Sequence, residues 1–439
     1  MDKSLLETLL DVLNQAQIKP VEGFKLKQWR ITLAQSQRIN IGVKNNNPGS
    51  VYTPPSYSNR EGGEVFLIWE DDKCSKARVQ NVFEREDYWL KQLSLWRLTA
   101  YNDHHEMLIP VPEKLPQVQI ANKDISNLFT GDNRQIFEHQ QKIIFDRPEI
   151  ALTNASLLAS WTRNLIYTST GIAADFPESR YAVSWSFDSQ ISQGFAERRF
   201  PTLDEWKHLW EESVSRYSLL QNKSQPITKD TVVILAPQVV DQMIEQFIIP
   251  NFKGENVLEN QSRFETQDFH KEQLFFDEKL SLEIDPLRPE KWTSYILTSE
   301  GIPATTTLLV DKGRLLTPYL NTKDGKRWRA HPTALPLGSG GIIINHKSST
   351  NWSQKINEIQ DGVLVLSVLG LHTQNHVAGS YSLAAPSCLR IEKGILTGRT
   401  DVRISGNMWR IMKSKDTTYA FSEHDNHPYI ITTTRPENL

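Results

Sequence analysis

Few residues in this chain have side chains and spacings that suit catalysis or metal binding, and most of them are histidines. His372 and His376 are four positions apart, a spacing that lets two imidazoles on a helix share one metal ion. Asn375 and the following Gly379 indicate instead a loop that leads into a strand, where residues four apart still share a face. For these two histidines, simple exposure to solvent is therefore the favoured interpretation. A polar lining of a groove or interface comes second, and a metal site comes last.

A second pair of histidines lies near the C-terminal end of the sequence. His424 and His427 stand among the acidic residues Glu423 and Asp425, so this polar cluster has the side chains that a metal ion needs. Chain termini are usually mobile and solvated, which favours plain exposure of these side chains. Any metal site of this chain would be drawn from these two pairs of histidines.

Other local patterns exclude several common chemistries. The segment Gly338-Ser-Gly-Gly341 lacks the Gly-x-x-x-x-Gly-Lys-Ser/Thr spacing of a phosphate loop and precedes a predicted strand, so we expect a loop at the start of a strand. No Gly-x-Ser-x-Gly occurs, which leaves a serine hydrolase of that type without support. The two cysteines, Cys74 and Cys388, cannot form a disulfide framework and are typical of a reducing compartment.

The composition is that of an ordinary globular protein. A chain of 439 residues is too long for one core and predicts two or three domains. The formal net charge of −3, from 49 basic and 52 acidic residues, gives no support for sequence-independent binding to nucleic acid. The first fifteen residues are amphipathic and acidic, unlike a signal peptide, and no apolar run is long enough to span a membrane. We therefore expect a cytoplasmic protein.

In the first half, helical spacing of leucines predicts a helix over residues 1–15, and strands are expected at 24–33 and 38–43. The stretch 45–63 is rich in Asn, Pro, Ser and Gly and predicts a long loop. Trp89 and Trp96 share one side of a predicted helix over 84–101, which we interpret as a partner surface. A helix over 203–219 and a polar linker over 221–229 end this half.

The second half begins with a short strand at 232–235 and Pro237. Apolar residues then recur at helical spacing up to Pro250, which predicts a helix over 237–249. Short strands separated by turns follow, with a hairpin signal at Asp311-Lys-Gly313. This density of strands favours a barrel-like or sandwich domain.

Several short segments between residues 154 and 412 follow one another in a fixed order. They include Ser299-Glu-Gly-Ile-Pro303, Ile404-Ser-Gly-Asn407 and a C-terminal signature, which reads LSVLGLHTQNHVAGSYSLAAPSCLRIEKG over residues 366–394. In this order they resemble segments of the TldD/PmbA family, which is named for modulation of DNA gyrase. Ser299 stands where the family usually has an acidic residue, and before residue 151 the match is poor. The resemblance implies an α+β fold: an N-terminal α/β domain over 1–222, divergent up to about 150, and a strand-rich C-terminal domain over 223–439.

The peptidase branch of that family carries His-Glu-x-x-x-His on a helix that holds zinc, and this chain has no such motif. By alignment with the family, Gln242, Met243 and Phe247 occupy the motif positions, to within about one residue of register. The conclusion does not depend on the register, because no histidine occurs between His208 and His270. A cysteine ligand that the branch has near its C-terminus is also missing, and Cys388 lies in an apolar run typical of a buried structural thiol.

The resemblance therefore implies the TldE (PmbA) branch, a non-catalytic subunit that pairs with a TldD-like zinc peptidase. Such complexes process or degrade unstructured peptides in the cytoplasm, and the partner would supply the zinc. This chain would bind no cofactor and would form half of a chamber, with an edge strand for extended peptide at 338–343 or 380–383. Alone, it could form a homodimer. Direct contact with nucleic acid or membrane is not expected.

The residues predicted to line this substrate groove or interface come from the signature and from the glycine-rich segment. They are His372, Asn375, His376, Gly379, Ser380, Tyr381, Ser382, Gly340 and Gly341. Two other functions stay open: an active hydrolase with a diverged metal set drawn from His372, His376, His424 or His427, and a non-enzymatic adaptor or self-associating protein.

Overall fold

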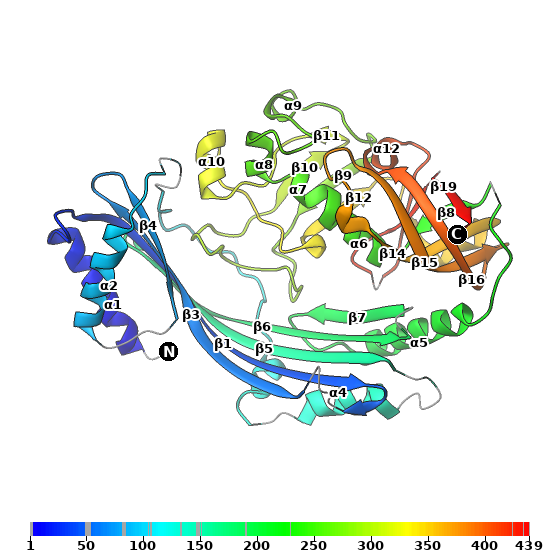
Figure 1. Ribbon diagram of the computed structural model, residues 1–439, viewed down its shortest axis with the longest axis horizontal. Coiled ribbons are helices and arrows are strands. Elements are labelled where there is room, and N and C mark those ends of the chain that lie inside the picture. The colour runs from blue at the N-terminus through cyan, green and yellow to red at the C-terminus, as the bar shows by residue number, and fades with distance from the viewer. Residues whose placement is uncertain are drawn as a thin grey trace.

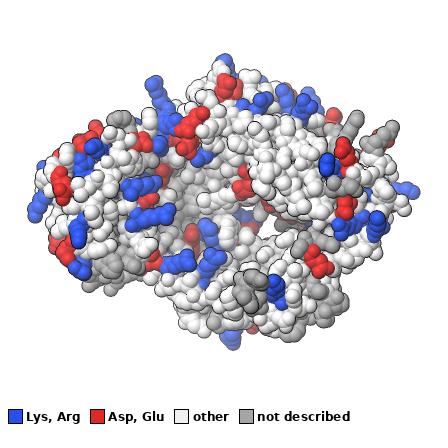
Figure 2. Space-filling model, in the orientation of Figure 1, with Lys and Arg blue, Asp and Glu red and all other residues white. Residues whose placement is uncertain are grey.

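A computed structural model of the chain shows three β-sheets with helices packed on and between them (Figure 1). It describes residues 3–438 except 49–53, 81–84, 104, 106–107, 132–133, 146–149, 151, 189–190, 229, 424 and 433. The expected α+β class is confirmed. No helix within these described ranges is long and apolar enough to cross a membrane. On the face of the molecule that Figure 2 shows, basic and acidic residues are interspersed.

The first sheet is antiparallel, strongly curved and built from the first half of the chain (Figure 1). Its order is β4-β3-β1-β5-β6-β7, and a short β2 pairs with the end of β1. The strands are β1 (Leu26–Lys44), β2 (Asn47–Pro48), β3 (Ser56–Trp69), β4 (Cys74–Val79), β5 (Asn154–Thr168), β6 (Ala173–Phe187) and β7 (Ile191–Glu197).

The strands of this sheet are longer than the sequence pattern predicts. Residues 24–33 and 38–43 do not form two strands, because β1 runs through the polar residues between them. The predicted loop over 45–63 is wrong in its second part, where Ser56 pairs with Asn40 and the pairing continues along β3. Polar residues can occupy both faces there because the middle of the sheet is only partly covered. Gly63 marks a close approach of strands, since a Cβ there would lie 1.9 Å from the Thr32 carbonyl oxygen.

Helices cover the two ends of this sheet (Figure 1). At the end near β4 lie α1 (Lys3–Ile18) and α2 (Glu86–Leu98). The other helices of this half are α3 (Lys123–Asn127), α4 (Arg134–Phe145) and α5 (Leu203–Leu220), and α4 and α5 lie at the opposite end. Trp89 of α2 is only 1% exposed and packs in a core with Trp29 and Trp69. The interpretation of Trp89 as a partner surface is therefore wrong, because the side chain anchors α2 to the sheet.

The start of α5 shows why the predicted helix over 203–219 forms. Thr202 Oγ1 accepts a hydrogen bond from the Glu205 main-chain N–H, and the Glu205 carboxylate accepts one from the Thr202 N–H. This reciprocal pair caps the helix at its first residues. Trp206 and Trp210 follow on the buried face and pack against Trp185 of β6. The helix thus closes the first half of the chain onto its sheet.

The second sheet has eight strands in the order β13-β17-β18-β8-β14-β15-β16-β19. The pairs β8–β14 and β13–β17 are parallel and the others antiparallel. The strands are β8 (Val232–Leu235), β13 (Thr350–Asn351), β14 (Asp361–Leu369), β15 (Ser380–Glu392), β16 (Ile395–Asn407), β17 (Thr418–Phe421), β18 (Tyr429–Thr432) and β19 (Arg435–Asn438).

The third sheet has four antiparallel strands in the order β11-β10-β9-β12, so β12 forms one of its edges. Its strands are β9 (Leu280–Ile284), β10 (Thr307–Asp311), β11 (Arg314–Leu315) and β12 (Ile342–His346). Short helices connect the two later sheets: α8 (Gly254–Leu258), α9 (Thr266–His270), α10 (Thr322–Trp328), α11 (Trp352–Lys355), α12 (Met408–Lys413) and 3₁₀ turns at Ser339–Gly341, Ile356–Glu358 and Leu371–Thr373.

The eight-stranded sheet is buried on both faces. One face packs against residues of the first sheet and α5, including Trp185 and Trp210. The other face packs against the four-stranded sheet and the helical segment that follows β8. Strands buried on both faces read as continuous apolar runs, which explains why β8 and the middle of β14 lack alternation.

Candidate functional site

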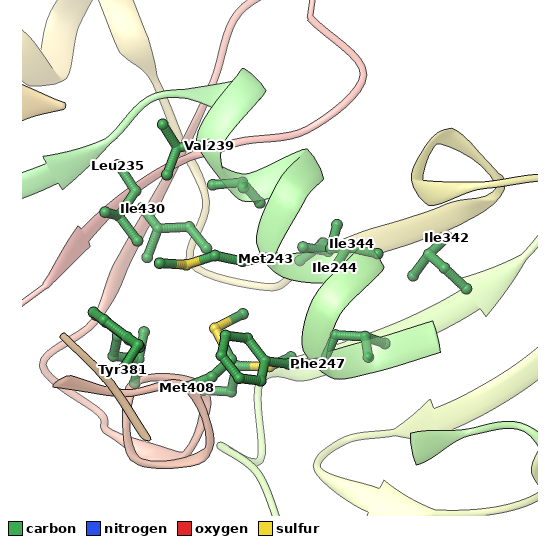
Figure 3. Close-up of a cluster of buried hydrophobic side chains, with 14 of the residues drawn as sticks. Leu235, Val239, Met243, Ile244, Phe247, Ile342, Ile344, Tyr381, Met408 and Ile430 are labelled. Atoms are coloured by element: carbon green, nitrogen blue, oxygen red, sulfur yellow. The ribbon is translucent and has the colours of Figure 1, made fainter. Parts of the chain in front are cut away.

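The helical segment that follows β8 is the centre of the candidate site. It consists of α6 (Pro237–Met243), a π-helical turn (Ile244–Ile248) and α7 (Ile249–Asn251). Pro237 is tolerated because it stands in the first turn, where its missing N–H has no helical partner. Figure 3 shows this segment running among apolar side chains from β8, β12, β15, α12 and β18, which lie on both sides of it in the view.

Two of the three aligned motif positions lie in that cluster. Met243 and Phe247 are both 0% exposed, and the Phe247 ring packs beside Met408 and Tyr381 (Figure 3). Gln242 is exposed. The polar side of the segment thus carries Gln242 and, within one turn, Asp241, Glu245 and Gln246. If the family's His-Glu-x-x-x-His motif is aligned one residue earlier, its three positions fall on Asp241, Gln242 and Gln246, which lie on this accessible side.

The glycine-rich segment 338–341 is held against this polar side. The Glu245 carboxylate accepts a hydrogen bond of 2.5 Å from the Ser339 main-chain N–H. Gly340 offers its carbonyl oxygen to Arg288 Nη2 at 2.9 Å, and Gly341 is buried. The segment forms a 3₁₀ turn and then enters edge strand β12, so the expected loop at the start of a strand is confirmed.

Signature residues 370–379 form a loop that the same helical segment holds from the other direction. Gln246 Nε2 donates to the Gln374 carbonyl oxygen at 2.7 Å, and Asn251 Nδ2 donates to that of His376 at 3.0 Å. Asn375 Oδ1 accepts from the main-chain N–H groups of Val377 and Ala378, which fixes the turn into β15. The structure therefore brings the two predicted segments to one helix.

Gly379 ends this loop in a conformation that favours glycine. Its φ is +69°, and a Cβ on it would lie 2.3 Å from Trp409 Nε1. The indole N–H of Trp409 donates to the Val377 carbonyl oxygen at 3.0 Å. Asn407 Nδ2 adds bonds to the Ala378 carbonyl oxygen at 2.8 Å and to Ser380 Oγ at 3.0 Å. Hydrogen bonds thus hold the loop from two sides, from the helical segment and from Asn407 and Trp409.

The residues at the start of β15 alternate between solvent and core. Ser380 and Ser382 are exposed, whereas Tyr381 is 4% exposed. Residues 380–383 pair with β16, and pairing with β14 begins only at Ala384. Tyr381 therefore belongs to the core under the helix, and the two serines face outward, where Ser382 Oγ accepts from Ser405 Oγ at 3.1 Å.

The histidines do not form a common site. His372 is exposed, and His376 uses Nε2 to donate to the Gln261 carbonyl oxygen at 3.1 Å. His424 lies outside the described residues. The expected exposure of His427 is wrong: its side chain is 1% exposed, Nδ1 contacts Asp241 Oδ1 and Nε2 lies 2.7 Å from the Ile342 carbonyl oxygen. Strand β18 draws this part of the tail into the sheet, which buries the ring.

The residues present do not fit a zinc ion. In the part of the chain that the structure describes, no three His, Cys, Asp or Glu side chains gather as metal ligands. On the polar side of the helical segment only carboxylates are suitable donors, and both are engaged, Asp241 with His427 and Glu245 with Ser339. Burial raises the pKa of the Cys388 thiol, whose Sγ donates to the Ala385 carbonyl oxygen, so this thiol is structural.

The sequence interpretation missed Asp241, Glu245, Gln246 and Asn251, which make the contacts described above. A signal for them existed, because the first three are the polar positions between the apolar residues of the predicted helix. What the sequence did not contain was the identity of the segments that those side chains contact.

Comparison with known proteins agrees with this architecture. Residues 228–432 match the family model described as the PmbA/TldA metallopeptidase C-terminal domain, so the family resemblance is confirmed for this part of the chain. A search of curated proteins found no match to the chain.

Solved structures extend the likeness in fold to nearly the whole chain. TldE from Thermococcus kodakarensis superposes with a TM-score of 0.78 at 17% identity, covering 98% of this chain and 99% of that one. A protein described as a modulator of DNA gyrase from Thermotoga maritima gives 0.76 at 16% identity, with 98% and 99% covered. One from Bacteroides thetaiotaomicron gives 0.77 at 13% identity, with 100% and 99% covered.

Proposed function

We propose, from the premise that residues 228–432 are a PmbA/TldD-type C-terminal domain within a TldE-like fold, that the chain is a non-catalytic subunit of a peptidase complex. Its partner would be a TldD-like zinc peptidase acting on unstructured peptides. The observation that carries the proposal is the helical segment after β8, whose accessible side offers glutamines and engaged carboxylates where a zinc peptidase needs imidazoles.

The π-helical turn supports descent from a metal-binding helix. The two histidines of His-Glu-x-x-x-His are five residues apart, which on an α-helix separates them by about 140° around the axis. A π-turn, with bonds between residues five apart, brings such positions onto one side. Here the Ile249 N–H bonds to the Ile244 carbonyl oxygen. In the register one residue earlier, the two histidine positions fall on Asp241 and Gln246, which both lie on the accessible side and are not imidazoles.

A diverged metal set has little support from the described histidines. A ring nitrogen must have a free lone pair to ligate a metal, and the Nε2 of His427 points at a carbonyl oxygen, which can only accept. Nε2 of His376 also faces a carbonyl oxygen. His372 alone is open to solvent, and a single imidazole does not make a zinc site.

The chain would contribute a peptide-binding surface rather than chemistry. Among the described strands, β12 is an edge strand that pairs with β9 only. His427 Nε2 already takes the Ile342 carbonyl oxygen, so a peptide strand would add to this edge beyond that residue. The bonds from Glu245 and Gln246 position the glycine-rich segment and the signature loop relative to this edge. We infer that the helical segment has exchanged metal binding for the support of these two loops.

The test is cleavage of an unstructured fluorogenic peptide by this chain, by its TldD-like partner and by the mixture, each with and without a zinc chelator. We expect chelator-sensitive cleavage in the mixture and none from this chain alone. Replacing the motif glutamate of the partner by glutamine should abolish activity, whereas Gln242→Ala in this chain should leave it unchanged. Chelator-sensitive cleavage by this chain alone would show an active hydrolase, and absence of any complex would favour the adaptor.

A further inference from the structure

A cavity lies on the outer side of the residues that hold the signature loop, and no role has yet been assigned to it. Its volume is about 320 Å³, within the range of small-ligand sites. Its walls are formed by Ala378 of the loop, by α12 and by the residues on either side of α9. The lining residues are Arg263, Phe264, Phe275, Phe276, Ala378, Asn407, Trp409, Arg410 and Lys413.

The floor of this cavity is aromatic and well ordered by mutual packing. Phe264 lies at the centre, with ring centroids 5.2 Å from Phe275, 6.0 Å from Phe276 and 5.5 Å from Trp409. Phe275 and Trp409 are partly exposed, so they can still bury the apolar part of a ligand. The bond from Trp409 to Val377 fixes its indole, so this wall is already formed without a ligand.

The rim of the cavity carries only positive charge. Arg263, Arg410 and Lys413 are all exposed, and no acidic residue lines the cavity. Among the described ion pairs these three cations have no acidic partner, unlike the paired Arg199 or Arg390. Asn407 cannot serve a ligand in their place, since its Nδ2 and Oδ1 are already bonded to the loop and to the Arg410 N–H. The cavity thus combines an apolar floor with three uncompensated cations.

We propose that this cavity binds the C-terminal residue of a peptide, with its carboxylate at the cationic rim and an apolar side chain on the aromatic floor. A free C-terminal residue carries an anion and a side chain on one carbon, which matches a site of this size and charge pattern. The inference rests on the proposed function in one respect only, the choice of a peptide as ligand. It adds that this subunit recognises a chain end, not only extended backbone.

The test uses this chain alone and a rhodamine-labelled pentapeptide, Gly-Gly-Gly-Gly-Phe, as the free acid and as the C-terminal amide. Fluorescence anisotropy should show the acid binding roughly tenfold more tightly than the amide, as one lost charge-assisted contact would produce. Arg410→Gln and Lys413→Gln should each weaken binding of the acid several-fold and leave the amide unchanged. Lys415→Gln removes an exposed charge close in sequence but outside the cavity, and it should change neither.

The floor is tested with the same two peptides. Phe275→Ala should weaken the binding of the acid and of the amide to the same extent. Thermal unfolding of the variant serves as the control that it is folded. Equal binding of acid and amide, or an effect of Lys415→Gln as large as that of Arg410→Gln, would overturn the proposal. So would displacement of the probe by adenosine monophosphate but not by N-acetylphenylalanine, which would indicate a nucleotide site. Because no partner is present, these outcomes are independent of whether the mixture cleaves peptides.

Discussion

The His427 ring lies between the Asp241 carboxylate and the Ile342 carbonyl oxygen, one at each ring nitrogen. A carbonyl oxygen can only accept, so Nε2 carries a hydrogen and donates it to Ile342. This buried contact joins three parts of the chain: the helical segment after β8, edge strand β12 and the tail before β18.

His427→Ala should destabilise the protein by about 2–4 kcal/mol, because the substitution opens a cavity and leaves buried polar groups without a partner. The midpoint of urea unfolding measures this loss. His331→Ala is the matched control, since His331 is exposed and its loss should change stability by no more than about 0.5 kcal/mol. Equal midpoints for the two variants would show that the contact contributes nothing.

Truncating a side chain to alanine should change the free energy of unfolding much more on the buried side of the helical segment than on its exposed side. Phe247→Ala removes a fully buried ring and should cost about 3–5 kcal/mol, whereas Gln242→Ala on the exposed side should stay within about 0.5 kcal/mol. Chemical denaturation of both variants under one set of conditions provides the measurement. A large loss from Gln242→Ala would mean that this side is covered in solution.

Gly379→Ala should be destabilising by about 2 kcal/mol or more, because the residue has a positive φ and its Cβ would overlap the Trp409 indole. Trp409→Ala in the same chain removes the overlap but not the backbone strain, so the double variant should recover part of the loss. A double-mutant cycle by thermal unfolding measures this coupling. Strict additivity of the two substitutions would contradict the contact.

His139 gives the protein a defined dependence on pH. Burial lowers the pKa of His139 to about 4, and its Nδ1 contacts Tyr181 Oη at 2.7 Å. The folded pKa is below the unfolded value near 6.5, so the unfolded state binds the extra proton first and stability falls as pH falls between them. From pH 7 to pH 5 this group should remove about 2 kcal/mol.

His139→Gln keeps a hydrogen-bonding group beside Tyr181 and removes the titration, so the variant should lose less stability than the wild type over that interval. The comparison must be between the two proteins, because Asp425 acts in the opposite direction. Burial raises the pKa of Asp425 to about 6, which lowers stability as pH rises. Parallel pH profiles of the two proteins would refute the assignment to His139.

Much of the fold could be predicted from local patterns, and the failures have a physical reason. The leucines of α1, the capping residues of α5 and the apolar stripe after Pro237 identify helices whose stability depends on one face. The middle of β1 and the start of β3 have no apolar face, since their polar residues are held by pairing with distant strands. No local sequence pattern in residues 45–63 predicts that pairing.

The site was predictable in its parts and not in its arrangement. The missing histidines, the signature and the glycine-rich segment are visible in the sequence. What joins them is not, because Gln246 and Asn251 bond to the signature loop more than a hundred residues later, and Glu245 bonds to Ser339 of the glycine-rich segment. His427 was misjudged for the same reason, because its burial follows from β18 pairing with β8 rather than from its polar neighbours.

The position of β8 also has a consequence for the newly made chain on the ribosome. Val232–Leu235 must pair with β18, where Leu235 meets Ile430 nearly two hundred residues later. At 5–20 residues per second, β18 emerges roughly 10–40 s after β8. Strands β12 and β14 are made about halfway through that interval, so in its first half the apolar side chains around Met243 and Phe247 have neither strand to cover them. We expect half-made chains to bind holdase chaperones, and rapid overproduction to yield aggregates rather than folded protein.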